Sequence, residues 1–322
     1  MIGRLVAAAG LALLLPAAAQ AQDYPSRPIR IVVGYAPGGT TDIIARIIGA
    51  QLSKTMHQAV VVDNRPGAGG NIGADLVAKS APDGYTLMLG TAGTMAVNPW
   101  IYKTMPVDTV RDFAPVSLIA SLPNLMVVNP QVPAKTVQEF VAWAKARPGA
   151  VFFGSSGTGN TPHLTAELFN LATGLQMVHV PYKGSGPALS DLVGGKGIQV
   201  MFDNMPSAIG FARAGTLRAL AVTGPKRVAS DPDIPTVAES GYPGFNVVTW
   251  FGLFAPAGTP PAVVERLNRE VAEAVRNPEI AKRLSDLGAE PGTNTPAEFA
   301  TMVKDARETW GKAVKAAKIQ PS

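Results

Sequence analysis

The sequence contains no cysteine among its 322 residues. This absence excludes a disulfide-stapled scaffold, thiolate-bound zinc or iron–sulfur sites, and a cysteine nucleophile. Histidine is almost as scarce, with three residues, so few imidazole ligands or general bases are available. After the first segment, no apolar run reaches the ~18 residues that a membrane-spanning helix needs. The sequence therefore predicts a globular protein without thiol chemistry.

The residues that are present describe a chain with a large core. Hydrophobic residues make up 47% and charged residues 16%, a composition typical of folded globular proteins. The 33 glycines and 28 prolines follow no Gly-X-Y period, which excludes collagen, and they fall between apolar runs as loop residues do. The formal net charge is +5, but the basic residues are scattered, so we expect no nucleic-acid partner. The length is sufficient for two lobes.

The first 21 residues have the pattern of a signal peptide. Arg4 precedes an apolar run over 5–15, and Ala19-Gln20-Ala21 supplies a small-x-small cleavage site. The alternative, a membrane anchor, is disfavoured because the apolar run is short. The predicted mature chain starts at Gln22, and no cysteine is available for a lipid anchor. We therefore expect a protein exported to the periplasm of a two-membrane bacterium.

Strand and helix signals alternate along the mature chain. The expected strands are 29–35, 59–62, 85–89, 125–128, 151–153, 177–180, 198–202, 218–222 and 247–255. The expected helices are 41–54, 71–80, one that starts at Thr136, 162–173, and two that start near 258–261 and 295–298. Such alternation predicts a mostly parallel, doubly wound α/β architecture.

Two glycine-rich turns each join a predicted strand to a predicted helix. The first reads Tyr35-Ala36-Pro37-Gly38-Gly39-Thr40-Thr41-Asp42, and the second reads Gly154-Ser155-Ser156-Gly157-Thr158-Gly159-Asn160-Thr161-Pro162. Free backbone N–H groups and the positive end of a helix dipole favour an anion at such a turn. Two lobes facing each other would place one turn on each side of a cleft. The alternative for each turn is an ordinary, well-capped loop.

Two weaker candidates end other strands. Thr91 lies in a shorter turn, Gly90-Thr91-Ala92-Gly93, after the strand at 85–89. Asp203 ends the strand at 198–202 and either contributes a carboxylate to the same cleft or caps a loop.

Other chemistries find little support. Neither turn has the P-loop lysine, the Gly-x-Gly-x-x-Gly dinucleotide pattern or a Gly-x-Ser-x-Gly elbow. His163 and Glu167 have metal-ligand spacing on a predicted helix, but no third ligand is evident, so we expect no metal and no cofactor. No pattern nominates a catalytic triad. We therefore expect a binding protein and not an enzyme.

Several further motifs, in this order, carry a resemblance to a known family. They are Tyr24-Pro25-Ser26-Arg27-Pro28-Ile29, the turn at 35–42, Asn64-Arg65-Pro66-Gly67-Ala68-Gly69-Gly70, Pro82-Asp83-Gly84-Tyr85-Thr86-Leu87, the turn at 154–160, Val180-Pro181-Tyr182-Lys183-Gly184, and Ala255-Pro256-Ala257-Gly258-Thr259-Pro260. Over the whole mature chain the sequence resembles the substrate-binding proteins of tripartite tricarboxylate transporters, also called Bordetella uptake gene (Bug) proteins.

The resemblance implies a two-lobed type II periplasmic binding protein, each lobe a mostly parallel sheet flanked by helices. Lobe 1 would comprise 22–122 and 246–322, and lobe 2 would comprise 123–245. The two turns would hold the carboxylate of a small organic anion. The implied site residues are Tyr35, Ala36, Gly38, Gly39, Thr40 and Thr91 on one lobe, and Ser155, Ser156, Gly157, Thr158, Gly159 and Asn160 on the other. Asp203 would lie near the far end of the ligand.

The resemblance also implies partners. A monomeric receptor would deliver the captured carboxylate to a membrane permease of the tripartite type. Three alternatives remain open at this point: a sensor module for a membrane kinase, an exported hydrolase or isomerase that uses the cleft, and a transcription-factor effector lobe. The leader and the missing helix-turn-helix oppose the last of these.

Overall fold

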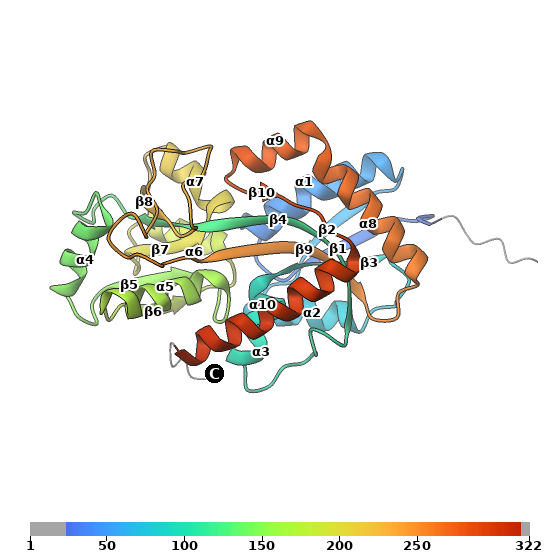
Figure 1. Ribbon diagram of the computed structural model, residues 1–322, viewed down its shortest axis with the longest axis horizontal. Helices are drawn as coiled ribbons and strands as arrows, with labels where there is room; N and C mark the ends of the chain where they lie inside the picture. Colours follow the sequence, from blue (N-terminus) through green and yellow to red (C-terminus); the bar gives the residue numbers. More distant parts are fainter. Residues whose placement is uncertain (1–23, 317–322) are drawn as a thin grey trace, which may run out of the picture.

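The protein is a two-lobed α/β structure, as expected (Figure 1). The computed structural model describes residues 24–316, so the predicted signal peptide lies outside the described residues. Ten strands form one continuous curled sheet in the order β2-β1-β3-β9-β4-β7-β5-β6, with β8 and β10 also paired to β4. None of the helices within 24–316 combines the length and apolar character needed to cross a bilayer.

The first half of the sheet is built from the N-terminal strands and one late strand. Its strands are β1 (Ile29–Val33), β2 (Val60–Asn64), β3 (Thr86–Thr91), β9 (Val248–Pro256) and β10 (Glu290–Pro291). The helices beside it are α1 (Thr40–Thr55), α2 (Asn71–Ala78), α3 (Asn98–Ile101), α8 (Pro261–Arg276) and α9 (Pro278–Asp286). The short helices η1 (Ala68–Gly70) and η2 (Gly93–Val97) flank α2 and β3. Strands β1, β2 and β3 run parallel, whereas β9 is antiparallel to β3.

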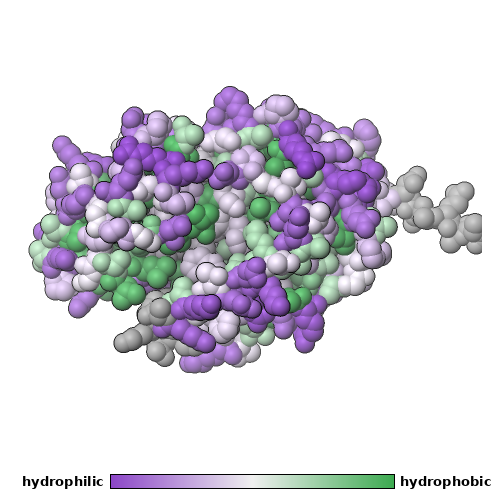
Figure 2. All heavy atoms as spheres, in the orientation of Figure 1, coloured by the Kyte–Doolittle hydropathy of each residue, from purple (hydrophilic) through white to green (hydrophobic). Residues whose placement is uncertain are grey.

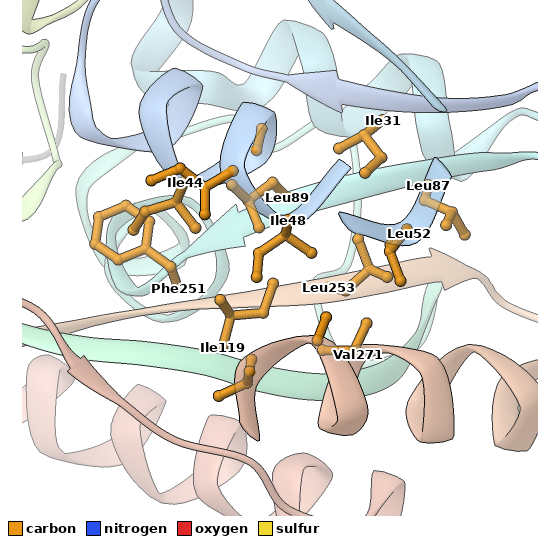
Figure 3. Packing of buried hydrophobic residues seen from close by; sticks show 14 of the residues in the cluster. Ile31, Ile44, Ile48, Leu52, Leu87, Leu89, Ile119, Phe251, Leu253 and Val271 are labelled. Carbon is orange, nitrogen blue, oxygen red and sulfur yellow. The ribbon is translucent and has the colours of Figure 1, made fainter. Parts of the chain in front are cut away.

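The apolar stripe of α1 explains why this helix packs on the sheet. Ile44, Ile48 and Leu52 lie on one face of the helix and are fully buried. Figure 3 shows them facing Leu89 and Leu253 of the sheet. The start of α1, which follows the first glycine-rich turn, is thereby held at the carboxyl end of β1.

The second half of the sheet repeats this arrangement. Its strands are β5 (Phe152–Ser155), β6 (Val178–Pro181), β7 (Val200–Asn204) and β8 (Arg218–Val222), and its helices are α4 (Val137–Lys145), α5 (Thr161–Thr173), α6 (Ser185–Val193) and α7 (Met205–Arg213). Strand β5 is parallel to both β6 and β7. The start of α5, which follows the second glycine-rich turn, therefore lies at the carboxyl end of β5.

One long strand, β4 (Phe113–Val128), connects the two halves. It pairs with β9 as far as Pro123 and with β7 from Asn124 onward. The sequence predicted only its last four residues, because Pro115 and Pro123 interrupt the apolar pattern. Two register shifts, between Pro115 and Ser117 and between Leu118 and Ala120, also break the two-residue period of side chains that identifies a strand.

The C-terminal helix α10 (Pro296–Ala316) covers the first half of the sheet. The expected capping box is present: Glu298 N donates to Thr295 Oγ1 at 3.2 Å, and Thr295 N donates to Glu298 Oε2 at 2.8 Å. The ring of Phe299 is fully buried, with its centroid 5.0 Å from Phe254 and 5.6 Å from Trp250. Figure 1 shows α10 crossing beneath β4 and β9.

Replacement of Phe299 by alanine tests this packing. The ring fills the space between α10 and β9, so its removal leaves a cavity that the sheet cannot close. We expect the free energy of unfolding to fall by about 3–5 kcal/mol, measured by urea denaturation. A change below about 1 kcal/mol, as for exposed positions, would show that α10 does not pack on the sheet in this way.

One face of the molecule is of mixed hydropathy (Figure 2). Hydrophilic residues are spread over this face, with apolar patches between them.

Candidate functional site

Four helix N-termini converge on one cavity between the two halves. Helices α1, α5, α6 and α7 begin at Thr40, Thr161, Ser185 and Met205, and residues at each start line the cavity. Its full lining is Tyr35, Gly39, Thr40, Thr41, Thr91, Ser156, Asn160, Thr161, Pro162, Ser185, Asn204, Thr249 and Phe251. Each helix N-terminus carries a partial positive charge and free N–H groups. The arrangement is suited to binding an anion.

The cavity is small in this arrangement of the lobes. Its volume is about 20 Å³, which is room for about one water molecule. A second cavity of about 200 Å³ adjoins it, since Tyr35 and Ser156 line both. Gly157 and Thr158 of the second turn line only this second cavity.

The first turn is held by its own helix and by the opposite lobe. Asp42 accepts a hydrogen bond from Gly38 N at 3.1 Å and pairs with Arg46 at 2.9 Å. Burial opposes the charge of Asp42, but the bonds from Arg46 and Gly38 hold its pKa below the usual value. Ala36 N donates to the Lys183 carbonyl of the opposite half at 2.9 Å, so this N–H group is not free to bind a ligand in this arrangement.

Thr40 also contacts the opposite lobe. Its Oγ1 lies 3.0 Å from Ser207 Oγ and accepts from Ser207 N at 3.2 Å. The sequence predicts a hydroxyl donor to a ligand at this position. In this closed arrangement the Thr40 hydroxyl instead bridges the lobes at the wall of the cavity.

Tyr35 and Thr91 form a polar network beneath the cavity. The Tyr35 hydroxyl donates to the Gly69 carbonyl at 3.0 Å and lies 2.9 Å from Thr94 Oγ1 and 3.3 Å from Thr91 Oγ1. Burial raises the pKa of Tyr35, so the phenol is neutral at pH 7. The network fixes the ring of Tyr35, a residue that lines both cavities.

Ser156 is the clearest hydroxyl donor of the second turn. Its Oγ accepts a hydrogen bond from Asn160 Nδ2 at 2.7 Å, so its own proton stays free to point into the cavity. Asn160 Oδ1 in turn accepts from His163 N at 3.0 Å and caps α5, a position at which asparagine is among the preferred residues. One side chain thus both starts the helix and orients the serine.

Ser155 faces away from the cavity. It is fully buried, and its Oγ lies 2.7 Å from His179 Nε2. The rings of His179 and His163 stack at 3.9 Å, and His163 Nδ1 accepts from Gly159 N at 3.2 Å. Burial lowers the pKa of His163 to about 4 and that of His179 to about 3, so both are neutral at pH 7. The two histidines support the second turn from behind.

Metal binding at His163 and Glu167 gains no support. The two side chains lie 3.7 Å apart, but nowhere in 24–316 do three His, Asp or Glu side chains form a group able to hold a metal ion.

Asp203 does not line the cavity. Its carboxylate has no exposed surface and accepts from Ser185 Oγ at 2.6 Å and from Ser207 Oγ at 2.5 Å. Burial raises the pKa of Asp203 to about 6, although these hydrogen bonds oppose the shift. The carboxylate therefore lies one side chain behind the cavity wall, at the starts of α6 and α7.

The pH dependence of stability tests the burial of Asp203. Its pKa rises from 3.8 in the unfolded chain to about 6 in the fold, so its charge costs nothing below about pH 4 and destabilises the fold increasingly up to about pH 6. We expect the free energy of unfolding of Asp203→Asn, minus that of the wild type, to rise by about 3 kcal/mol between acid and neutral pH. A difference that does not vary with pH would contradict this burial.

Sequence reasoning located some of the cavity residues and missed others. The cavity includes the predicted Tyr35, Gly39, Thr40, Thr91, Ser156 and Asn160. The other predicted residues, Ala36, Gly38, Ser155, Gly157, Thr158, Gly159 and Asp203, lie beside it or behind it. Thr41, Thr161 and Pro162 belong to the two predicted turns and also line the cavity, as does Asn204, which follows Asp203 at the end of a predicted strand. The missed residues are Ser185, Thr249 and Phe251. A role in binding stays a prediction for every one of them.

Two of the lining residues carry unpaired buried atoms. Asn204 Oδ1 and Thr249 Oγ1 are buried without a hydrogen-bond partner, and both residues line the cavity. The sequence indicates Asn204, because its amide follows Asp203 at the end of a predicted strand. Thr249 lies within β9 and has no local signal.

The sequence and the fold match those of known proteins. The model of the tripartite tricarboxylate transporter family receptor matches residues 44–319. Protein BugT of Bordetella pertussis is 40% identical over 316 residues, which is 98% of this chain and 95% of BugT.

Solved structures agree with this match. Rpa4515 of R. palustris, solved with adipate, is 42% identical with a TM-score of 0.91, over 93% of this chain and 100% of that one. MatC of Rhodopseudomonas palustris, solved with bound malate, is 34% identical with a TM-score of 0.86, over 90% of this chain and 100% of that one. Both names describe proteins that hold small carboxylates.

Proposed function

The chain belongs to the tripartite tricarboxylate transporter receptor family of periplasmic solute-binding proteins, which are not enzymes, and from this premise we propose that it captures a small carboxylate between its lobes and delivers it to a membrane permease. The observation that carries the proposal is the convergence of four helix N-termini on one interlobe cavity. The adipate and malate held by two relatives support a carboxylate as the ligand class.

The donors available are sufficient for useful affinity without an arginine clamp. The Ser156 hydroxyl and the backbone N–H groups at the starts of α1 and α5 are charge-neutral donors to a carboxylate. Hydrogen bonds to a charged group contribute ~1.5–3 kcal/mol each. Three or four of them, less the cost of association, correspond to roughly micromolar binding.

Binding requires the lobes to separate. The contacts of Thr40 with Ser207 and of Ala36 with Lys183 close the walls of the cavities, so a ligand enters only when the lobes move apart. Once the lobes close again, a dicarboxylate extends from the cavity of about 20 Å³ into the adjoining one of about 200 Å³. We infer a hinge at β4 and β9, where the pairing of β4 changes after Pro123. This change of partner supports lobe boundaries at 22–122, 123–245 and 246–322.

The predicted signal peptide at 1–21 supports export to the periplasm. A receptor in that compartment can deliver its ligand to a permease in the inner membrane. Loss of labelled-carboxylate uptake in cells lacking this chain, restored by its expression, is the result expected for a transport receptor. Unchanged uptake would favour a role in sensing.

A thermal-shift screen of the chain from Gln22 against a carboxylate library tests the binding function. A ligand at ~100 times its Kd stabilises the protein by ~2.7 kcal/mol, which raises Tm by a few degrees. Any compound that shifts Tm is then incubated with the protein and recovered. If the compound is recovered chemically unchanged, the result supports a receptor. If it is converted to a product, the result supports an enzyme. A library that gives no shift in protein freed of copurified ligand would contradict the proposal.

A further inference from the structure

The side of the cavity formed by α6 and α7 differs from the side formed by α1 and α5. Behind it lies the buried carboxylate of Asp203, which receives hydrogen bonds from Ser185 and Ser207. Ser185 lines the cavity, and Ser207 lies against Thr40. Nothing about the proposed binding of a carboxylate at the glycine-rich turns requires this arrangement.

The direction of the protons follows from Asp203. An ionised carboxylate only accepts hydrogen bonds, and each serine hydroxyl has a single proton. Bonds to a charged acceptor are the stronger ones, so both serine protons point toward Asp203. Ser207 Oγ then accepts from the Thr40 hydroxyl at 3.0 Å. The Ser185 hydroxyl has no proton left for the cavity and presents only its lone pairs.

One unpaired atom points to the same polarity. Asn204 lines this cavity, and its buried Oδ1, which can only accept, has no hydrogen-bond partner. The hydroxyl of Thr249, a lining residue in β9, is also unpaired and can donate or accept. Ser156, across the cavity, supplies a donor.

The charges are divided in the same way. Asp203 offsets the partial positive charges at the starts of α6 and α7. Helix α5 has no acidic residue in its first turn, and Asp42 of α1 is paired with Arg46. The histidines behind α5 are neutral at pH 7. The uncompensated positive potential therefore lies on the α1–α5 side, and a second ionised carboxylate on the α6–α7 side would meet a resident anion.

We propose that Asp203, acting through Ser185, makes the α6–α7 side of the cavity select a hydrogen-bond donor of the ligand, such as an alcohol, an ammonium group or a protonated carboxyl, and reject a second ionised carboxylate. This inference rests on the proposed function, because it assumes that the first carboxylate of the ligand binds at the starts of α1 and α5. The preferred ligands are then hydroxy acids and amino acids. A dicarboxylate enters with one proton retained.

Calorimetry with matched pairs of ligands tests this selection. The pairs are succinate with 4-hydroxybutyrate, glutarate with 5-hydroxypentanoate, and adipate with 6-hydroxyhexanoate, titrated at about pH 8, where both carboxyls of each diacid are ionised. We expect the wild type to bind the hydroxy acid of the best-fitting pair at least about tenfold more tightly. We also expect any dicarboxylate that binds to take up a proton, which is measured by comparing buffers of different ionisation heat.

Two variants test the roles of Asp203 and Ser185 in this selection. In Asp203→Asn the amide N–H donates to one serine, which turns that serine's proton away, so the preference for the hydroxy acid should fall by about tenfold or reverse. Ser185→Ala removes the lone pairs and should also abolish the preference while leaving Asp203 in place. Asp231→Asn, whose carboxylate pairs with Arg213 outside the cavity, serves as the control and should keep the wild-type preference.

The outcomes separate this inference from the proposed function. An unchanged preference in both Asp203→Asn and Ser185→Ala, or wild-type binding of a dicarboxylate without proton uptake, would overturn the inference alone. If the wild type binds no carboxylate at all, the proposed function fails and the inference fails with it.

Discussion

Replacement of Gly186 by alanine is expected to abolish tight ligand binding while leaving each lobe intact. Gly186 is the second residue of α6, and a Cβ there would lie 2.5 Å from the Pro37 carbonyl oxygen of the opposite lobe. The lobes therefore cannot reach the closed arrangement. Loss of the donors from one lobe, at ~1.5–3 kcal/mol each, predicts an affinity at least about 100-fold weaker.

Helix propensity predicts that Gly186→Ala does not destabilise the ligand-free protein. Alanine is favoured over glycine in a helix by ~1 kcal/mol, so the Tm of the ligand-free variant should stay the same or rise. Gly210→Ala in α7 is the matched control, since nothing lies within 4 Å of a Cβ at that position. Small-angle scattering with and without ligand should show closure in the control and not in Gly186→Ala. Wild-type affinity in Gly186→Ala would mean that the ligand is not enclosed by this closure.

Replacement of Ser156 by alanine should weaken carboxylate binding by about 10- to 100-fold. Asn160 Nδ2 occupies a lone pair of Ser156, so the hydroxyl proton is available to the ligand at no cost in reorientation. One hydrogen bond to a charged group contributes ~1.5–3 kcal/mol, and each ~1.4 kcal/mol is a factor of ten in affinity. The variant should unfold at nearly the wild-type temperature, because Asn160 still caps α5.

Titration calorimetry of Ser156→Ala beside Ser190→Ala checks this expectation. Ser190 is exposed on α6, so the Ser190→Ala variant should bind the ligand with wild-type affinity. If the affinity of Ser156→Ala is within about twofold of the wild-type affinity, the Ser156 hydroxyl of the second turn does not donate to the ligand.

The glycine-rich turns could be identified from the sequence because their signal is local. Each has a strand, a run of small residues and a helix start within about ten positions, as the chain around Gly39 and Asn160 does. The structure bears out the turns as helix starts at the cavity. The capping box at Thr295 can be predicted from the sequence for the same reason, and the structure confirms it.

The rest of the cavity depends on contacts between distant segments. Ser185 and Asn204 reach it because α6 and α7 start at the same edge of the second half-sheet, and Thr249 because β9 crosses between the lobes. Asp203 was visible as a candidate, but its burial was not. Two serines, 18 and 4 positions away in sequence, cover its carboxylate only after the two helices pack.

The central claim is that an ionised carboxylate is bound in the interlobe cavity by helix N-termini and hydroxyl donors. Titration calorimetry of the wild type with the best carboxylate and with its primary amide, which has the same shape without the charge, tests it most directly. The account predicts binding of one carboxylate per chain and at least about 100-fold weaker binding of the amide, since two or more charge-assisted bonds are lost. Equal binding of the two compounds would contradict it.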